Sequence, residues 1–347
     1  MNWTKTLMAW YAENKRNFPW RDSKDAYHVW LSEIILQQTR VQQGLPYFLK
    51  FIEAFPRVSD LANAPEEQVL KLWQGLGYYS RARNLLFSAQ WIVEQNDGQF
   101  PENHKELLQL KGVGDYTASA IASICFEEPQ AVVDGNVYRF LSRYFGIELP
   151  IDSSPAHAFF KNKAMGLMVD VSPGDFNQAM MEFGALQCTP KRTSCYSCPF
   201  ATSCVAFQQG KVDQLPVKSK KTRVRKRYFN YLVLSSPTGK TQLIQRKGKG
   251  IWQNLYEFPL IESERLLKRN EGNKLSAFVN WDSAQYNSPR LLNDSPIKHL
   301  LSHQQLLVNF WAVETQSEPQ NALVSSDLKA LPVPVVIADF IEKHYPD

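Results

Sequence analysis

Apolar residues along the first 208 positions recur with the spacing of helices. Tyr79 to Gln95 and Phe140 to Tyr144 carry apolar residues three and four positions apart, which is the period of one buried helix face. Short breaks containing proline or glycine separate such runs between Lys5 and Arg143. We therefore predict a mainly helical domain over residues 1–208.

The pattern changes after Tyr228. Residues 229–234 have the composition of a strand, 237–239 form a turn signal, and 241–246 are predicted to be the returning strand. A further strand is expected at 306–313. We predict a smaller α+β domain over residues 228–347.

A basic linker is expected between the two domains, over residues 209–227. Its second half, from Val217 to Arg227, holds seven lysines and arginines and no acid. Such a run is most simply a solvated linker, and it would also be attracted to phosphates.

Composition agrees with two folded domains. A length of 347 residues suits about two domains, and a hydrophobic content of 44% excludes wholesale disorder. The net charge of +5 permits a polyanionic partner without requiring one. The chain has no apolar run long enough to span a membrane and no signal peptide pattern at its start. We expect no membrane partner and a cytoplasmic location.

Four of the five cysteines form one compact motif. Cys188, Cys195, Cys198 and Cys204 have intervening spacers of six, two and five residues. In a chain without an export signal, such a set indicates metal binding in a reducing compartment rather than disulfides. Zinc sites usually show two close pairs separated by a longer loop, so this spacing favours an iron–sulfur cluster over zinc. Lys191 and Arg192, inside the first spacer, are candidates for phosphate contact.

A glycine-containing turn lies between two helical runs at Leu110–Gly114. The segment is Gly112, Val113 and Gly114, and its two glycines let backbone N–H groups approach a phosphate. The helix that follows adds positive potential at its N-terminus. This turn resembles the helix–hairpin–helix of the endonuclease III superfamily of DNA glycosylases, although Lys111 stands where proline often precedes the glycine. Asp134, some twenty residues downstream, also fits the superfamily.

Three further segments resemble the adenine-specific, MutY-type branch of these enzymes. They are Trp30–Thr39, Gly75–Asn84 and the helix start at Tyr116. Lyases of the superfamily carry a lysine at the position of Tyr116. Since that amine is missing, the resemblance implies a monofunctional enzyme, which uses water to hydrolyse the bond to the nucleobase and leaves an abasic site.

The resemblance also implies a cofactor, a cellular location and a substrate. The expected protein is a bacterial enzyme with a [4Fe-4S] cluster, monomeric and working at the nucleoid. Its expected substrate is duplex DNA in which adenine is paired with 8-oxoguanine or guanine.

Two carboxyl groups are the predicted catalytic pair. Glu33 stands in a run that is apolar almost all round, which indicates partial burial and a raised pKa. By resemblance, it donates a proton to the departing adenine and later activates water. Asp134 precedes an apolar helix face and reads as an N-cap. Its fixed charge would also stabilise an oxocarbenium-like transition state, with Asn136 and Tyr116 as supporting hydrogen-bond partners.

The remaining candidates concern DNA recognition. Adenine must be flipped out of the duplex, and by resemblance Gln38 and Tyr78 insert among the bases. Residues 250–259 resemble the Nudix-like domain of these enzymes, but the acidic Nudix box is absent, which favours recognition over hydrolysis. Ser302 and His303 align with the loop that reads 8-oxoguanine, and Leu301 stands where the family has phenylalanine.

Two other functions remain open at this point. One is a bifunctional lyase acting on oxidised pyrimidines, against which Tyr116 and the extra domain count. The other is a non-catalytic zinc protein that binds DNA, which the colour of the purified protein would distinguish from an iron–sulfur enzyme.

Overall fold

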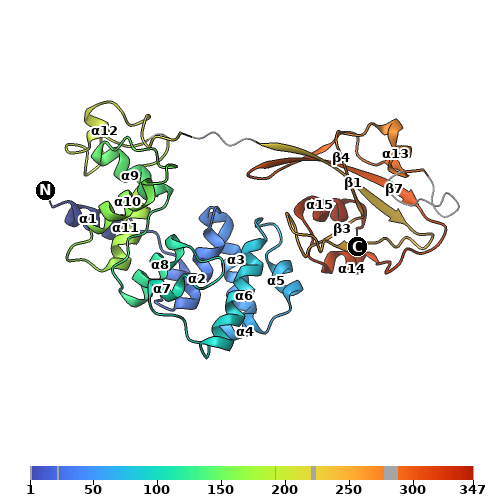
Figure 1. Cartoon of the computed structure of the whole chain (residues 1–347), viewed down its shortest axis with the longest axis horizontal. Helices are drawn as coiled ribbons and strands as arrows, with labels where there is room; N and C mark the ends of the chain where they lie inside the picture. Colours follow the sequence, from blue (N-terminus) through green and yellow to red (C-terminus); the bar gives the residue numbers. More distant parts are fainter. Residues whose placement is uncertain (1, 22, 192, 220–223, 277–287, 347) are drawn as a thin grey trace. The chain divides into compact units, whose positions relative to one another are not determined.

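A computed structural model describes residues 2–21, 23–191, 193–219, 224–276 and 288–346. The chain divides into two compact units (Figure 1). The first combines Met1–Asn63 with Asn84–Lys220, and the second combines Ala64–Arg83 with Lys221–Asp347. A segment of twenty residues from the N-terminal half therefore packs with the C-terminal half.

The first unit is helical. Its helices are α1 (Trp3–Asn14), η1 (Pro19–Arg21), α2 (Ala26–Leu36), α3 (Val41–Ala54), α4 (Val58–Ala62), α7 (His104–Leu107), α8 (Asp115–Phe126), α9 (Gly135–Phe145), α10 (Ala156–Met165), α11 (Pro173–Leu186) and α12 (Val205–Gln208). Helix α6 (Ser80–Gln95) begins in the second unit and continues into the first.

The predicted helix faces are confirmed. Ala82, Leu85, Ala89 and Ile92 of α6 are buried at helical spacing. Val137, Phe140 and Leu141 of α9 are buried in a cluster with α1 and α11. Within that cluster the Phe140 ring lies 4.3 Å from the Phe183 ring. This aromatic packing holds α9 and α11 together, and both helices contribute to the cavity described below.

The second unit is α+β. Its strands are β1 (Arg225–Ser235), β2 (Ile244–Gln245), β3 (Tyr256–Glu257), β4 (Leu260–Ser263), β5 (Arg290–Leu291), β6 (Ile297–Leu300) and β7 (Gln304–Glu314). Its helices are α5 (Glu66–Leu72), η2 (Arg269–Glu271), α13 (Asn273–Ser276), α14 (Ser325–Ala330) and α15 (Val335–His344).

The main sheet has the order β4-β1-β7-β5, with β6 also on β7. β1 and β7 run parallel in a continuous register from Arg225↔Gln304 to Ser235↔Glu314. The rings of Phe310 in β7 and Phe340 in α15 stack at 4.0 Å, so α15 covers one face of this sheet (Figure 1). The predicted strands at 229–234 and 306–313 are confirmed.

The prediction of a returning strand at 241–246 is wrong. Only Ile244–Gln245 is a strand, and it pairs with β3 in a separate two-stranded sheet. Thr241 makes an isolated bridge to Leu323. The physical reason is that β1 has both edges occupied, by β4 antiparallel and by β7 parallel, which leaves it no edge for a hairpin partner.

Part of the expected linker is structured. β1 begins at Arg225, so the last three residues of the 209–227 segment lie in the sheet. Lys220, Lys221 and Arg223 of the basic run lie outside the described residues. Within the described part of the chain, no helix is both long and apolar enough to cross a membrane.

Candidate active site

Three helices of the first unit bring the predicted catalytic residues to one cavity of about 190 Å³. Glu33 comes from α2, Tyr116 from α8, and Asn136 from the first turn of α9, which Asp134 precedes. All four line the same cavity, so the structure brings together side chains that are separated by up to about a hundred residues.

Glu33 is the residue of this cavity with a pKa near neutrality. Its neighbours Trp30, Ile34 and Ile35 are buried, and the carboxyl group is largely desolvated. Burial raises its pKa to about 7, with the charge of Asp134 acting in the same direction, while the Tyr116 hydroxyl and the Arg21 guanidinium oppose the shift. A carboxyl group with this pKa is protonated in a large fraction of molecules at neutral pH and is able to act as an acid.

Asp134 is the N-cap of α9, as predicted. Its Oδ1 accepts from the backbone N–H of Asn136 at 2.9 Å and of Val137 at 2.8 Å, and its Oδ2 accepts from Asn136 Nδ2 at 2.7 Å. Burial raises the pKa of Asp134, whereas these three donors and Arg139 favour the ionised form. All three of these hydrogen bonds are donated to the carboxyl group, which suits a carboxylate.

Arg139 fixes Asn136 from the other side. Its Nη2 donates to Asn136 Oδ1 at 2.9 Å and to the Gly184 carbonyl at 2.5 Å. Its Nε donates to the Cys188 carbonyl at 2.7 Å. A Cβ added at Gly184 would lie 2.6 Å from Asn136 Cβ, so only glycine lets α11 approach the start of α9 this closely.

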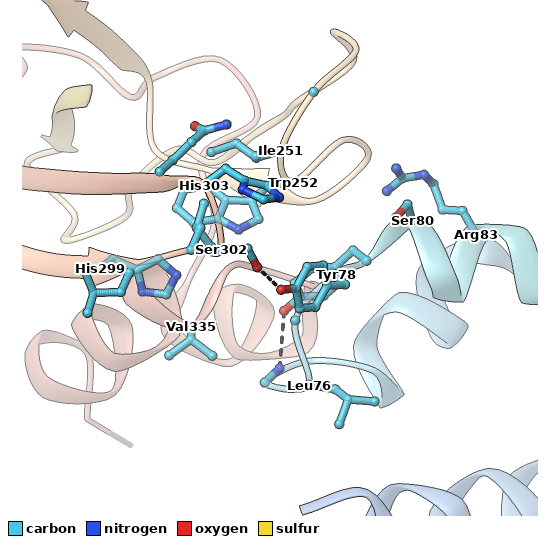
Figure 2. A pocket seen from close by; sticks show the side chains of 17 residues that line it. Leu76, Tyr78, Ser80, Arg83, Ile251, Trp252, His299, Ser302, His303 and Val335 are labelled. Carbon is cyan, nitrogen blue, oxygen red and sulfur yellow. Dashed lines mark hydrogen bonds between the residues drawn. The ribbon is translucent and has the colours of Figure 1, made fainter. Parts of the chain in front are cut away.

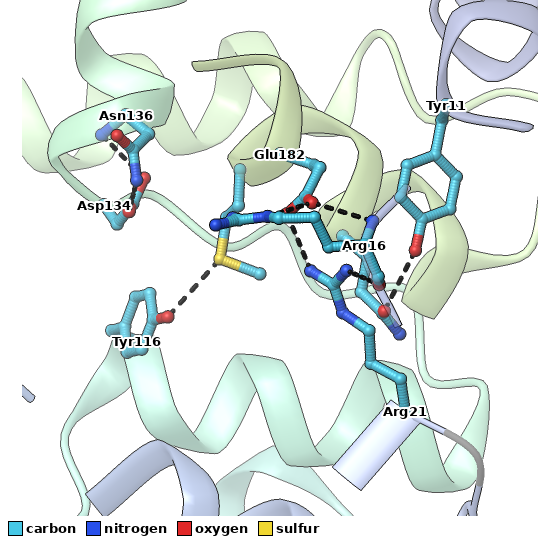
Figure 3. A network of polar contacts seen from close by, with 9 residues as sticks. Tyr11, Arg16, Arg21, Tyr116, Asp134, Asn136 and Glu182 are labelled. Atoms are coloured by element: carbon cyan, nitrogen blue, oxygen red, sulfur yellow. Dashed lines mark hydrogen bonds and ion pairs between the residues drawn. The ribbon is translucent and has the colours of Figure 1, made fainter. Parts of the chain in front are cut away.

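Sequence reasoning missed a second polar group of this cavity (Figure 3). Glu182 in α11 is buried and accepts from Arg16 Nε at 2.6 Å and from Arg21 Nη2 at 2.9 Å. Burial opposes its ionisation, but the hydrogen bonds from the two arginines outweigh burial and lower its pKa to about 2. A signal existed, because Glu182 stands alone in an apolar helical run just as Glu33 does. Besides Asp134, the cavity thus holds Glu33, whose pKa is near neutrality, and Glu182, which stays ionised.

The glycine-containing turn joins α7 and α8. Gly112 has a φ of +85°, and a Cβ there would meet Asn84 Cβ at 3.0 Å, so both backbone and space favour glycine. Gly114 is the N-cap residue of α8 and provides no side-chain cap. Val113 packs in the core of the unit.

Gln38, two residues after the end of α2, is exposed with a φ of +56°. Its neighbour Gln37 reaches the turn, with Nε2 donating to Thr117 Oγ1 at 3.2 Å. The end of α2 and the start of α8 are therefore in direct contact.

The second unit contains a separate pocket (Figure 2). Tyr78, Ser302 and His303 all line it, and the Tyr78 hydroxyl is hydrogen-bonded to Ser302 Oγ. Trp252 and His299 add aromatic surface, with ring centroids 5.5 Å apart. The structure thus joins the predicted inserting tyrosine to the predicted lesion-reading loop.

The four cysteines of the motif line one further pocket in the first unit. Arg143 Nη1 donates to Cys188 Sγ at 3.5 Å, which suits an anionic sulfur. Over the described residues, no group of three or more histidines, cysteines or acids is close enough to hold a single metal ion. In a four-iron cluster each of the four thiolates would bind a different iron, so the cysteines would not have to surround a single ion. Lys191 is exposed beside this loop, and Arg192 lies outside the described residues.

Comparison with known proteins identifies the families that the chain matches. Residues 31–161 match the family of HhH-GPD superfamily base excision DNA repair proteins, and residues 230–343 match the NUDIX domain. An adenine DNA glycosylase of Buchnera aphidicola subsp. Baizongia pistaciae is 30% identical over 89% of this chain and 85% of its own length. The adenine DNA glycosylase of Mus musculus is 33% identical over 90% of this chain and 70% of its own length.

A solved structure of a thermostable thymine-DNA glycosylase is also similar. It covers 59% of this chain and 95% of its own, with 28% identity and a TM-score of 0.56. Together with the relatives above, the matches span the helical unit and the sheet-containing unit. The chain therefore belongs to the adenine DNA glycosylase family of base excision repair enzymes, within the HhH-GPD superfamily, and carries a C-terminal NUDIX domain.

Proposed function

We propose that this protein hydrolyses the N-glycosidic bond of adenine paired with 8-oxoguanine or guanine in duplex DNA and leaves an abasic site. The observation that carries the proposal is the pairing, in one cavity, of Glu33 with a pKa of about 7 and Asp134 held by three hydrogen-bond donors. This is the division between acid and carboxylate that glycosidic bond cleavage needs.

The proposed reaction balances with water as the only co-reactant. Glu33 gives its proton to a ring nitrogen of adenine as the bond to C1′ breaks and the electron pair leaves with the base. The carboxylate of Asp134 stabilises the positive charge that develops on the sugar. Water then adds to C1′ and returns a proton to Glu33. Tyr116 and Asn136 hold the two carboxyl groups in place.

The enzyme is proposed to be monofunctional. A lyase would need an amine to form a Schiff base with the sugar. Tyr116 occupies that position, and the described lining of the catalytic cavity includes no lysine. This observation weighs against the bifunctional alternative.

DNA contacts are proposed for both units. Gly112, Val113 and Gly114 would present backbone donors to a phosphate, with Lys191, Arg192 and the basic segment within 209–227 adding charge. Gln38 and Tyr78 would insert among the bases when adenine is flipped. Ser302 and His303 would read 8-oxoguanine, and the hydrogen bond of Ser302 to Tyr78 supports a common recognition site.

Cys188, Cys195, Cys198 and Cys204 are the proposed ligands of a [4Fe-4S] cluster. Their shared pocket and the Arg143 donor support a metal site, and their spacing favours iron–sulfur over zinc. When bound, the cluster would fix the loop that carries Lys191 and Arg192. Free cysteines in this number suit a reducing compartment, and we propose a monomer that acts at the bacterial nucleoid in the cytoplasm.

We propose a helical catalytic domain over 1–208 and a Nudix-like recognition domain over 228–347, joined by the 209–227 segment. In this division, residues 64–83 belong to the catalytic domain by sequence and pack with the recognition domain.

One assay tests the reaction. A labelled duplex carrying a single A:8-oxoguanine pair is incubated with the protein and analysed with and without alkali. Cleavage after alkali alone is expected. Strand breaks without alkali would indicate a lyase, and intact DNA under both conditions would contradict the proposed activity.

A further inference from the structure

Tyr78 holds an unusual backbone conformation. Its φ is +47°, in the left-handed region, and it follows Gly75 at +98° and Gly77 at +76°. Glycine adopts this region freely, but for a tyrosine it costs energy that the surrounding structure must offset. The residue is also 46% exposed, so burial alone does not fix the position of its ring.

Arg81 contacts Tyr78 directly. Its side chain is 8% exposed, and its guanidinium lies 5.5 Å from the centre of the Tyr78 ring and 5.1 Å from that of Trp73. Its Nη2 also donates to the Gly77 carbonyl at 3.2 Å and more weakly to the Leu76 carbonyl at 3.5 Å. Burial lowers the pKa of Arg81 to about 10, so it remains charged at neutral pH.

The rest of the loop is fixed by contacts to its backbone and to other side chains. Trp73 Nε1 donates to the Gly77 carbonyl at 2.9 Å. The Tyr79 hydroxyl donates to the Val333 carbonyl at 3.4 Å, and Gln74 Oε1 accepts from the Val333 N–H at 3.2 Å. These contacts attach the loop to the C-terminal part of the unit. Arg81 adds a contact to the Tyr78 ring itself.

We propose that Arg81 is a positioning residue that holds the Tyr78 ring in the pocket shared with Ser302, and thereby sets the enzyme's discrimination between A:8-oxoguanine and A:G. This inference rests on the proposed reading of 8-oxoguanine at that pocket. A planar guanidinium stacks on an aromatic ring and donates to carbonyls at the same time, which an ammonium group or an apolar side chain cannot do.

A double-mutant cycle tests whether Arg81 acts through Tyr78. The variants are Arg81→Met, Tyr78→Ala and the pair together, all in the full-length holoenzyme. The measured quantity is the ratio of single-turnover efficiencies on A:8-oxoguanine and A:G duplexes. We expect Arg81→Met to lower this ratio about tenfold and to have little further effect once Tyr78 is alanine. An equal loss in both backgrounds would overturn the proposal.

Arg246→Met is the control for losing an arginine of the same unit that is partly buried, with 20% of its side chain exposed. Arg246 bonds Glu257 Oε1 at 2.6 Å and lies 5.9 Å from the Phe229 ring, and none of these residues lines the pocket. We expect this variant to lose thermal stability and keep the discrimination ratio. Arg81→Lys, which preserves charge and is the gentler change for folding, should recover only part of the ratio.

Hydrogen exchange separates this inference from the proposed function. In the DNA-free protein, the amides of residues 75–79 should exchange faster in Arg81→Met and remain protected in Arg246→Met. Unchanged exchange in Arg81→Met would refute the positioning role. Faster exchange together with an unchanged ratio in Tyr78→Ala would keep Arg81 as the anchor of the loop but contradict lesion reading at this pocket.

Discussion

The side-chain nitrogen of Asn136, Nδ2, donates to Asp134 Oδ2 at 2.7 Å, and the oxygen of the same amide, Oδ1, accepts from Arg139 Nη2 at 2.9 Å. The orientation of the amide is therefore fixed at both ends. Because Arg139 also donates to the Cys188 carbonyl, one guanidinium connects Asn136, the partner of the proposed catalytic Asp134, to the cysteine loop. Geometry at Asp134 thus depends on a residue outside the cavity.

Asp134→Asn should separate catalysis from folding. Asparagine is as good an N-cap as aspartate, so α9 should keep its cap and the melting temperature should change little. The fixed negative charge is lost, and we expect excision to fall by about 10²-fold or more. Single-turnover excision and thermal unfolding measure the two effects. Asp134→Ala is the control, because it removes both charge and cap and should also cost about 1 kcal/mol of stability. Wild-type excision by Asp134→Asn would assign Asp134 to capping alone.

Glu33→Gln should abolish excision while leaving DNA binding near normal. Glutamine is nearly isosteric but has no proton to give, so we expect a loss of about 10²-fold or more. In the wild-type protein, excision should fall as pH rises through about 7, because the protonated form is the acid. A flat pH–rate profile from 6 to 8.5 would exclude Glu33 as the acid.

The same residue predicts a pH dependence of stability. The pKa of Glu33 is about 7 in the folded protein and 4.5 in a model compound, so between these values the folded state binds more protons. The contribution of protonated Glu33 to the free energy of unfolding is therefore present at low pH and is lost as pH rises through 7. The loss amounts to at most about 3 kcal/mol. Glu33→Gln should raise the melting temperature relative to wild type more at pH 8 than at pH 5. An equal difference at both pH values would show that the Glu33 carboxyl is not desolvated.

Cys198→Ser should cost the protein its iron. A cluster that lacks one thiolate is labile, so visible absorbance and iron per chain should both fall, and DNA binding should weaken with the loop that carries Lys191. Cys125→Ser is the matched control, since Cys125 lies in α8 apart from the cysteine pocket. Iron content equal to wild type in Cys198→Ser would refute the ligand assignment.

The sequence predicted those features that depend on nearby residues. The apolar helix face that follows Asp134 predicts that this residue is an N-cap. The apolar neighbours of Glu33 predict that its carboxyl group is partly buried. Glu182 has the same local pattern, but its partners Arg16 and Arg21 lie 166 and 161 positions away. No local pattern reveals that such an acid is held ionised in the same cavity as Glu33.

The packing of residues 64–83 was unpredictable for the same reason. Lys71 Nζ donates to the carbonyls of Lys329 and Leu331, across about 260 positions of sequence. Arg83 Nη1 donates to the Gln253 carbonyl at 2.8 Å, and Asn254 Nδ2 donates to Glu66 Oε1 at 2.8 Å. Hydrogen bonds to backbone carbonyls cannot be predicted from the amino-acid sequence, because every residue carries a carbonyl group.

This packing changes what a truncated protein should do. A fragment ending near Gln214 keeps Glu33, Asp134 and the four cysteines, and should still remove adenine opposite guanine. It loses the reading loop and also the partners that hold residues 64–83, so its Tyr78 should be less well positioned. The ratio of activity on A:8-oxoguanine to activity on A:G should therefore shrink for two reasons that the fragment alone does not separate.

Ser302→Ala with His303→Ala in the full-length chain separates them. The contacts of Lys71, Gln74 and Arg83 remain, and only the polar groups facing the pocket are removed. Each hydrogen bond that discriminates between bases is worth about 1–3 kcal/mol, so the ratio should fall by about tenfold or more while affinity for undamaged duplex stays the same. Activity on A:8-oxoguanine and A:G duplexes and binding to undamaged DNA are measured side by side. If the double variant keeps the wild-type ratio and the fragment loses it, then the packing of residues 64–83, rather than Ser302 and His303, determines how the lesion is read.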